Sequence, residues 1–336
     1  MKKFMALLMS LFLLLGVAGC GGSSSNNTKS EKVAKAGYYK GKNVTMIVPY
    51  SAGGGTDTDA RTIAPFMEKE LGCKIQVTNV TGGGGWVAWQ KLLTGKNDGM
   101  TISVTNLPGI LVGYLNPKMN RKYTMKNFTF LGNFVSDPST IVMNKDEKRF
   151  KDMKSLIEYA KTHVVTFGTT GSGTDEGVLM YRLNAEFGTK FKEVPVKGAA
   201  QNMAAIQGGH IDVTGLNVSE VKKLHDNKQV VVLAVFSAKE NPLLKGVPAF
   251  NSLKLTSKSI VNNSSRGFAV KAGTPDNAVK ELEAALKKAA TNPEVVKKMA
   301  SYGSSADYMD AQADTKMIAE NETLLKGMAD LLGWTK

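Results

Sequence analysis

Short apolar segments alternate along the chain with longer segments whose apolar residues recur at helical spacing. Runs rich in β-branched and aromatic residues predict strands at 44–48, 74–78, 101–105, 128–134, 139–143, 164–168, 191–195, 211–215, 230–236 and 267–271. Helical spacing predicts helices at 57–71, 86–94, 152–161, 174–187, 199–207, 276–290 and 293–301. Pro65 lies inside the first of these helices and is expected to bend it. This alternation predicts an α/β fold with largely parallel sheets.

The length of the chain indicates more than one folded unit. The sequence has 336 residues, of which about 300 follow the N-terminal segment described below. A single hydrophobic core rarely serves so long a chain, and two domains are therefore expected.

The N-terminus has the pattern of an export signal. A pair of lysines precedes the apolar run Phe4–Leu15, which is too short to span a bilayer. The run ends in Val-Ala-Gly-Cys, and this small-residue site resembles a bacterial lipobox in which Cys20 is lipid-modified and becomes the first mature residue. The alternative is an ordinary cleavable signal followed by an incidental cysteine. The polar residues 21–30 then form a flexible tether, so we expect a signal peptide at 1–19, a lipidated N-terminus and tether at 20–40, and an extracytoplasmic protein anchored to the membrane without spanning it.

Charge and cysteine content narrow the possible partners. The formal charge is +14, which favours anionic partners in general. Nucleic acid is disfavoured, because the chain carries an export signal and its lysines form no basic stripe with interleaved aromatics. If Cys20 carries lipid, Cys73 has no partner for an internal disulfide.

The first glycine-rich loop is the strongest candidate for a binding site. The predicted strand 44–48 leads into Gly53, Gly54 and Gly55, and Thr56 and Asp57 are expected to cap the following helix. The first amides of a helix lack intrahelical partners and lie at the positive end of its dipole, so this loop is suited to a carboxylate or phosphate. The spacing matches neither the dinucleotide nor the P-loop pattern.

Two further strand-to-helix loops repeat this arrangement. The segment 167–177 contains glycines followed by Thr174 or Asp175 as a helix cap, and the segment 196–200 adds a cation in Lys197. A single glycine turn is routine where a strand leads into a helix. The recurrence of the pattern in both halves of the chain predicts that the loops converge on one small anionic molecule.

An enzyme has little support in the residues. No G-x-S-x-G elbow occurs, and the histidines, His163, His210 and His225, have no metal-ligand spacing. The acidic residues Asp57 and Asp175 are more simply explained as residues of helix starts. No metal and no cofactor are therefore expected.

Several segments together resemble the substrate-binding proteins of tripartite tricarboxylate transporters, the Bug family. They are IVPYSAGGGTDTDARTIAPFMEKELG from Ile47, VTNVTGGGGWVAWQKL from Val77, NDGMTI from Asn97, FGTTGSGT from Phe167, VPVKGAAQNMAAIQGGHIDV from Val194 and RGFAVKAGTPDNAVKEL from Arg266. The resemblance implies a two-lobe periplasmic binding protein fold with two crossover strands and a ligand cleft between the lobes. It implies lobe 1 at 41–143 plus 264–336 and lobe 2 at 144–263.

The resemblance also implies a function. The chain is then expected to be a monomeric extracytoplasmic binding protein that captures a small carboxylate and delivers it to membrane transporter subunits. The alternatives are a ligand-sensing lipoprotein or an extracytoplasmic enzyme acting on a small carboxylate. The loops 51–57 and 169–174 are then expected to hold the carboxylate through backbone amides and hydroxyls. The expected ligand-binding residues are Ser51, Ala52, Gly53, Gly54, Gly55, Thr56, Asp57, Gly85, Trp86, Thr105, Asn106, Thr169, Thr170, Gly171, Ser172, Gly173, Thr174, Lys197 and Gly198.

The chain departs from the family pattern at positions that affect specificity. Family members commonly have Asn where this chain has Trp86, Tyr where it has Val196, and His where it has Gly177. Trp86 is expected either to stack on the ligand or to pack within a lobe, with contact to the cleft slightly favoured. Because two polar partners are missing from lobe 2, a ligand smaller or more apolar than a tricarboxylate is expected.

Overall fold

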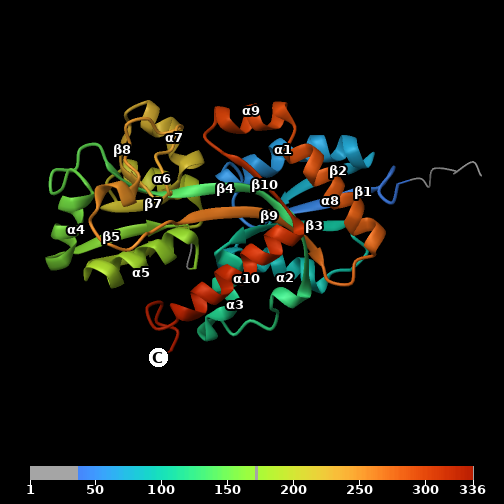
Figure 1. Cartoon of the computed structure of the whole chain (residues 1–336), viewed down its shortest axis with the longest axis horizontal. Helices are drawn as coiled ribbons and strands as arrows, with labels where there is room; N and C mark the ends of the chain where they lie inside the picture. The colour runs from blue at the N-terminus through green and yellow to red at the C-terminus, as the bar shows by residue number, and fades with distance from the viewer. Residues whose placement is uncertain (1–36, 171–172, 336) are drawn as a thin grey trace, which may run out of the picture. The chain divides into compact units, whose positions relative to one another are not determined.

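One long strand, β4 (Phe128–Asn144), connects all the strands into a single sheet (Figure 1). The computed structural model describes residues 37–170 and 173–335. The path through the sheet is β2-β1-β3-β9-β4-β7-β5-β6, with β10 and β8 also paired to β4. Residues 128–138 of β4 pair with β9, and residues 139–144 pair with β7 and β8. The partners of β4 therefore change near Pro138.

The strands on either side of β4 form what we call the first and second half-sheets. The first half-sheet contains β1 (Asn43–Val48), β2 (Lys74–Asn79), β3 (Thr101–Leu107), β9 (Asn263–Lys271) and β10 (Ala306–Asp310). The second contains β5 (Val164–Thr169), β6 (Lys190–Pro195), β7 (Val213–Asn217) and β8 (Val230–Val235). Within each half, three strands run parallel: β1 with β2 and β3, and β5 with β6 and β7.

Helices cover both faces of each half-sheet (Figure 1). Those of the first half are α1 (Gly55–Leu71), α2 (Trp86–Thr94), α3 (Gly109–Leu115), α8 (Asp276–Ala290), α9 (Pro293–Ser301) and α10 (Ala311–Gly327). Those of the second half are α4 (Met153–Thr162), α5 (Asp175–Phe187), α6 (Ala199–Gln207) and α7 (Val218–Asp226). Short 3-10 helices occur at Gly83–Gly85, Pro117–Met119, Met125–Asn127 and Phe250–Leu253.

The apolar positions of these elements form a core on each face of the sheet. In the first half, Ile63 of α1 and Leu282 of α8 are fully buried in the cluster that contains Phe134 and Phe268, whose rings stack with centroids 4.8 Å apart. In the second half, α4 and α5 pack on β5 in one cluster, and α6 and α7 pack in another. Separate cores form because the sequence places apolar residues on both faces of each strand, and each face must be covered.

Most predicted elements are present, with informative exceptions. The sheet is mixed rather than largely parallel, because β4 and β9 run antiparallel to their neighbours. The strands expected at 128–134 and 139–143 are one strand, since Pro138 lies where β4 exchanges partners. Helix α1 continues through Pro65 without interruption. The sequence pattern missed β10, α3, α7 and α10.

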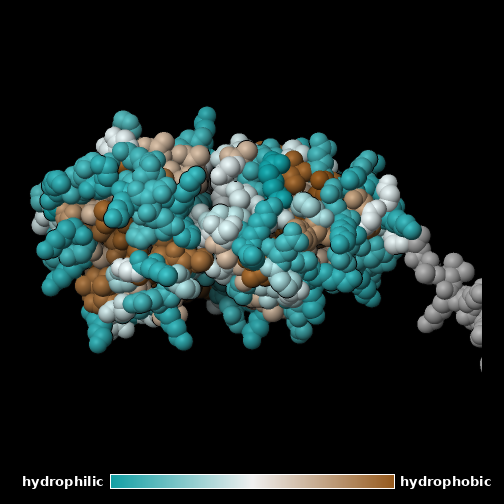
Figure 2. All heavy atoms as spheres, turned by 90° about the horizontal axis from the view of Figure 1, so that it is seen from above, coloured by the Kyte–Doolittle hydropathy of each residue, from teal (hydrophilic) through white to brown (hydrophobic). Residues whose placement is uncertain are grey.

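The exterior of the described residues is polar over much of its area. Figure 2 shows a face dominated by hydrophilic residues, with apolar residues gathered mainly over the second half. No helix among residues 37–170 and 173–335 is long and apolar enough to cross a membrane. The predicted signal peptide, the lipobox cysteine Cys20 and most of the tether lie outside the described residues.

Candidate functional site

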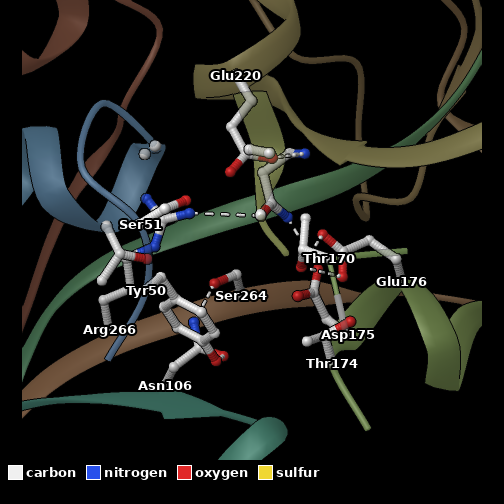
Figure 3. Close-up of a pocket in the computed structure, with 16 residues that line it drawn as sticks. Tyr50, Ser51, Asn106, Thr170, Thr174, Asp175, Glu176, Glu220, Ser264 and Arg266 are labelled. Carbon is white, nitrogen blue, oxygen red and sulfur yellow. Dashed lines mark hydrogen bonds between the residues drawn. The ribbon is translucent and has the colours of Figure 1, made fainter. Parts of the chain in front are cut away.

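A cavity of about 30 Å³ lies where strand ends from both half-sheets meet (Figure 3). Its volume is enough for about two water molecules or one carboxylate group. The lining residues are Tyr50, Ser51, Gly54, Gly55 and Thr56 after β1, Asn106 in β3, Thr170, Thr174, Asp175 and Glu176 after β5, Gly198 and Ala199 after β6, Asn217 at the end of β7, Glu220 in α7, and Ser264 and Arg266 in β9. Most of them follow the carboxyl ends of parallel strands, which is where open α/β sheets bind ligands.

The first glycine loop brings the start of α1 to this cavity. Gly53 adopts φ +81°, and its amide donates to Asp57 Oδ2 at 2.9 Å. Although burial opposes the shift, hydrogen bonds from Arg61, Gly53 and Asn79 lower the pKa of Asp57. The expected cap is different: α1 begins at Gly55 with Gly54 as the N-cap, and Asp57 reaches back to the loop from inside the first turn. Asp57 therefore holds the loop in place through its hydrogen bond to Gly53 and does not line the cavity.

The second loop contributes hydroxyls and carboxylates. Thr174 is the N-cap of α5, and Asp175 and Glu176 form its first turn. The Thr170 hydroxyl donates to both carboxylate oxygens of Glu176, at 3.2 and 3.1 Å. Thr169 is buried beneath the loop and donates to Glu193.

The expected binding residues are distributed over several places. Ser51, Gly54, Gly55, Thr56, Asn106, Thr170, Thr174 and Gly198 line the cavity. Gly85 and Lys197 line an adjoining cavity of about 500 Å³, which shares Tyr50 and Thr170 with the first. Ala52, Gly53, Asp57, Thr105, Thr169 and Gly173 lie outside both linings. Gly171 and Ser172 are outside the described residues.

Trp86 occupies the core of the first half. Its side chain is 1% exposed and meets Trp89 edge-on, with ring centroids 5.7 Å apart. A Cβ on Gly113 would lie 1.6 Å from Trp86 Nε1, so only glycine at that position leaves room for the indole. The favoured contact with the cleft is not observed, since the indole packs between α2 and α3 and lines neither cavity.

A buried ion cluster forms the floor of the site. Arg266 of β9 donates to Asp59 of α1, and its Nη2 lies 3.1 Å from Asp137 Oδ2 of β4. All three side chains are at most 1% exposed. Burial alone would lower the pKa of Arg266, but the charges of Asp59 and Asp137 raise it. Burial raises the pKa of Asp137 to about 6.

Three further carboxylates line the cavity without a cation of their own. Asp175 Oδ2 accepts from Ser139 at 2.6 Å and from Asn217 at 2.9 Å, and Glu220 Oε2 accepts from the Asn217 amide at 3.0 Å. Burial raises the pKa of Glu220 to about 7. Burial, together with the charges of Asp175 and Glu220, raises the pKa of Glu176 well above its usual range.

The sequence pattern did not identify the charged part of this site. Arg266 and Asp59 are 207 residues apart, and Glu220 lies in a helix that was not predicted. Asp175 was interpreted only as an acidic residue of a helix start, and Asp59 was assigned no role. In β9 the residue Arg266 stands between two serines and the apolar run 268–270, so the local sequence gave no clear signal that its side chain is buried.

Among the described residues, no group of three or more His, Cys, Asp or Glu is arranged to hold a metal ion. None of the three histidines lines the cavity. The lining instead offers hydroxyls, backbone amides and carboxylates, which suit reversible binding of a polar solute.

The chain is similar to known receptors over most of its length. The family model described as "Tripartite tricarboxylate transporter family receptor" matches residues 60–332. A UPF0065 protein of Agrobacterium vitis is 30% identical over 298 residues, which cover 87% of this chain and 85% of that protein.

Solved structures have the same fold. A TctC solute binding protein from Polaromonas is 25% identical, with a TM-score of 0.65 over 86% of this chain and 98% of that one. MatC from Rhodopseudomonas palustris with bound malate is 22% identical, with a TM-score of 0.79 over 87% of this chain and 99% of that one. The expected periplasmic binding protein fold is confirmed, and the lobe boundaries at 143 and 264 stay a prediction.

The ion cluster predicts a large effect of one substitution. Arg266→Met would leave Asp59 and Asp137 buried without their cation, and we expect a loss of about 3–5 kcal/mol in the free energy of unfolding. Urea denaturation measures this free energy of unfolding. The control is Lys288→Met, which breaks an exposed pair with Glu70 and should change stability by less than about 0.5 kcal/mol. Equal effects of the two substitutions would contradict a stabilising role for Arg266.

The raised pKa of Glu220 predicts that the stability of the folded protein depends on pH. Its pKa in the folded protein is about 7 against an ordinary 4.5, so the folded state holds more protons between these values and stability falls as the pH rises through them. Glu220→Gln keeps the acceptor for the Asn217 amide and removes the charge. We expect the free energy of unfolding of the variant to exceed that of the parent by roughly 1 kcal/mol at about pH 8, and by less at about pH 5.

Thermal unfolding at the two pH values checks this expectation. Glu158→Gln, on the exposed face of α4, is the control and should follow the parent at both values. A parent-to-variant difference that is the same at both values would show that Glu220 does not titrate in this range.

Proposed function

The chain belongs to the tripartite tricarboxylate transporter receptor family, and from this premise we propose that it captures a small carboxylate-bearing solute in the cavity at the start of α1 and delivers it to a membrane transporter of that kind. Receptors of this family are extracytoplasmic solute-binding proteins, not enzymes. A protein of the same fold, MatC, has bound malate.

One observation carries the proposal: two helices begin at the cavity. The N-cap and first residues of α1, Gly54–Thr56, line it, and so do Thr174–Glu176 at the start of α5. The first amides of each helix have no intrahelical backbone acceptor and lie at the positive end of the dipole. At α5 the amides of Asp175 and Glu176 hydrogen-bond to the carboxylates of these same residues. At the start of α1 a carboxylate oxygen of the solute supplies the acceptor, and the hydroxyls of Ser51 and Thr56 offer further donors beside it.

The family and the N-terminal sequence together support a proposed location outside the cytoplasm and beside the membrane. A cleaved signal that ends at Cys20, a lipid on that cysteine and the polar tether would hold the binding domain beside the membrane, where a transporter collects its solute. We propose that a monomer performs this delivery.

The first loop gives the direct test of binding. Gly54 has φ −78°, and a Cβ there would meet only Ser51 O at 3.5 Å and Ala199 Cβ at 4.0 Å, so Gly54→Val should fold. Its two methyl groups would fill the small cavity where the carboxylate is proposed to lie. We expect affinity for the tightest carboxylate of a panel that includes malate to fall by about 100-fold, as measured by titration calorimetry.

The matched control is Gly327→Val at the end of α10, where an added Cβ meets nothing within 4 Å. Circular dichroism establishes that both variants are folded. A folded Gly54→Val protein that binds as tightly as the parent would place the anion elsewhere. Consumption of the carboxylate during the titration would indicate an enzyme instead.

The anchor has its own test. Cys20→Ala removes the only acceptor for the proposed lipid, and the protein should move from the membrane fraction to the soluble fraction while retaining the melting temperature of its binding domain. Fractionation followed by immunoblotting measures the change, with Cys73→Ala as the control that should stay with the membrane. Membrane association that survives Cys20→Ala would rule out the lipid anchor.

A further inference from the structure

The small cavity at the start of α1 adjoins a larger one. Its volume of about 30 Å³ holds a carboxylate group but not the rest of a solute. The neighbouring cavity of about 500 Å³ shares Tyr50 and Thr170 with it (Figure 3). The chain also passes from one lining into the other between Tyr50 and Ser51 and between Lys197 and Gly198. A solute whose carboxylate lies in the small cavity can therefore extend into the larger one, which has the volume of an ordinary ligand pocket.

A third cavity gives the solute another direction in which to extend. It has a volume of about 850 Å³ and shares Gly54, Gly55 and Glu220 with the small cavity. A carboxylate solute that extended this way would pass the side chain of Glu220, and two like charges repel each other. The residues shared with the cavity of about 500 Å³, Tyr50 and Thr170, are uncharged. The geometry therefore favours the cavity of about 500 Å³ for the rest of the solute.

Most side chains around this larger cavity present apolar surface. They are Pro49, Tyr50, Met119 and Val196. The tyrosine ring and the methionine thioether both pack favourably against an aromatic ring. Lys197 supplies the charge of the lining, but its side chain is exposed to water. An ion pair between Lys197 and a second anionic group of the solute would therefore be screened and weak.

Four consecutive glycines form another wall of the larger cavity. Gly82–Gly85 all have φ between +58° and +121°, a region that favours glycine. They present backbone without side chains, so the solute can approach this wall closely. A flat group makes the largest contact with such a wall.

The hydroxyls shared by the two cavities already have acceptors. Tyr50 donates to Asn106 Oδ1 at 3.2 Å, and Thr170 donates to the carboxylate of Glu176 at 3.2 and 3.1 Å. Each hydroxyl has a single proton, so neither one can donate to a second acidic group of the solute. An apolar group beyond the carboxylate loses no hydrogen bond by lying there.

We propose that the solute is an aryl carboxylate, with its carboxylate in the small cavity at the start of α1 and its ring in the cavity of about 500 Å³. The inference rests on the proposed function and names the solute class for that site. The ring would lie against Tyr50, Met119 and the glycines 82–85. Lys197, at the same cavity, attracts the face of an aromatic ring.

Probes that differ in one group test the proposal. The matched pairs are malonate and phenylacetate, succinate and 3-phenylpropanoate, and glutarate and 4-phenylbutanoate, in which a phenyl ring replaces the second carboxylate. Titration calorimetry of the full chain measures both members of each pair. We expect the ring-bearing member of the best-binding pair to bind at least about tenfold more tightly, because the ring buries apolar surface in the larger cavity.

A variant then assigns the preference to the larger cavity. Val196 lines this cavity but not the small one, and Val196→Phe would fill part of the space proposed for the ring. Affinity for the ring-bearing probe should fall at least about tenfold, while affinity for the dicarboxylate of the same pair should change less than about threefold. The matched control is Val164→Phe at the start of β5, where the side chain is 61% exposed, and it should leave both affinities unchanged.

The outcomes separate this inference from the proposed function. A smaller preference for the ring in the parent protein, or tighter binding of the dicarboxylate, overturns the aryl carboxylate and leaves a carboxylate receptor in place. A ring preference that survives intact in Val196→Phe, shown to be folded by circular dichroism, overturns the assignment to this cavity. Failure of every probe, with or without a ring, contradicts the proposed function itself.

Discussion

The buried contact between Arg266, Asp59 and Asp137 is the constraint on which the site depends. It joins the first turns of α1 to β4, which passes between the half-sheets, and to β9, which pairs with β4 in the first half-sheet. Charges withdrawn from water are stable only when their partners are held in good geometry. The cluster therefore fixes the position of α1, and with it the glycine loop, relative to β4, which continues into the second half-sheet.

Asn217 extends this constraint to the other wall of the cavity. Its Oδ1 accepts from Arg266 Nη2 at 3.3 Å, and its Nδ2 donates to Asp175 at 2.9 Å and to the Asp137 carbonyl at 3.2 Å. One amide side chain thus connects the ion cluster to the start of α5. Because Arg266 is neutralised by its own partners, the remaining acids give the cavity its negative character.

Helix starts and carboxylates have opposite preferences within the same small space. Unpaired amides at the start of α1 favour an anion, and the acids after β5 and β7 favour a cation. The adjoining cavity of about 500 Å³, with Lys197 and the glycines 82–85, offers further room beside this small space.

The sequence by itself determined the elements and the loops. Strands such as 44–48 and helices such as 276–290 follow from local periodicity, and eight of the expected binding residues line the cavity because a strand followed by glycines and a helix start has a defined local geometry. Only the tertiary structure decided the charge of the site, the burial of Trp86 and the mixed sheet. These depend on residues far apart in the chain, such as Asp59 and Arg266, and no local pattern encodes which distant side chains will share a space withdrawn from water.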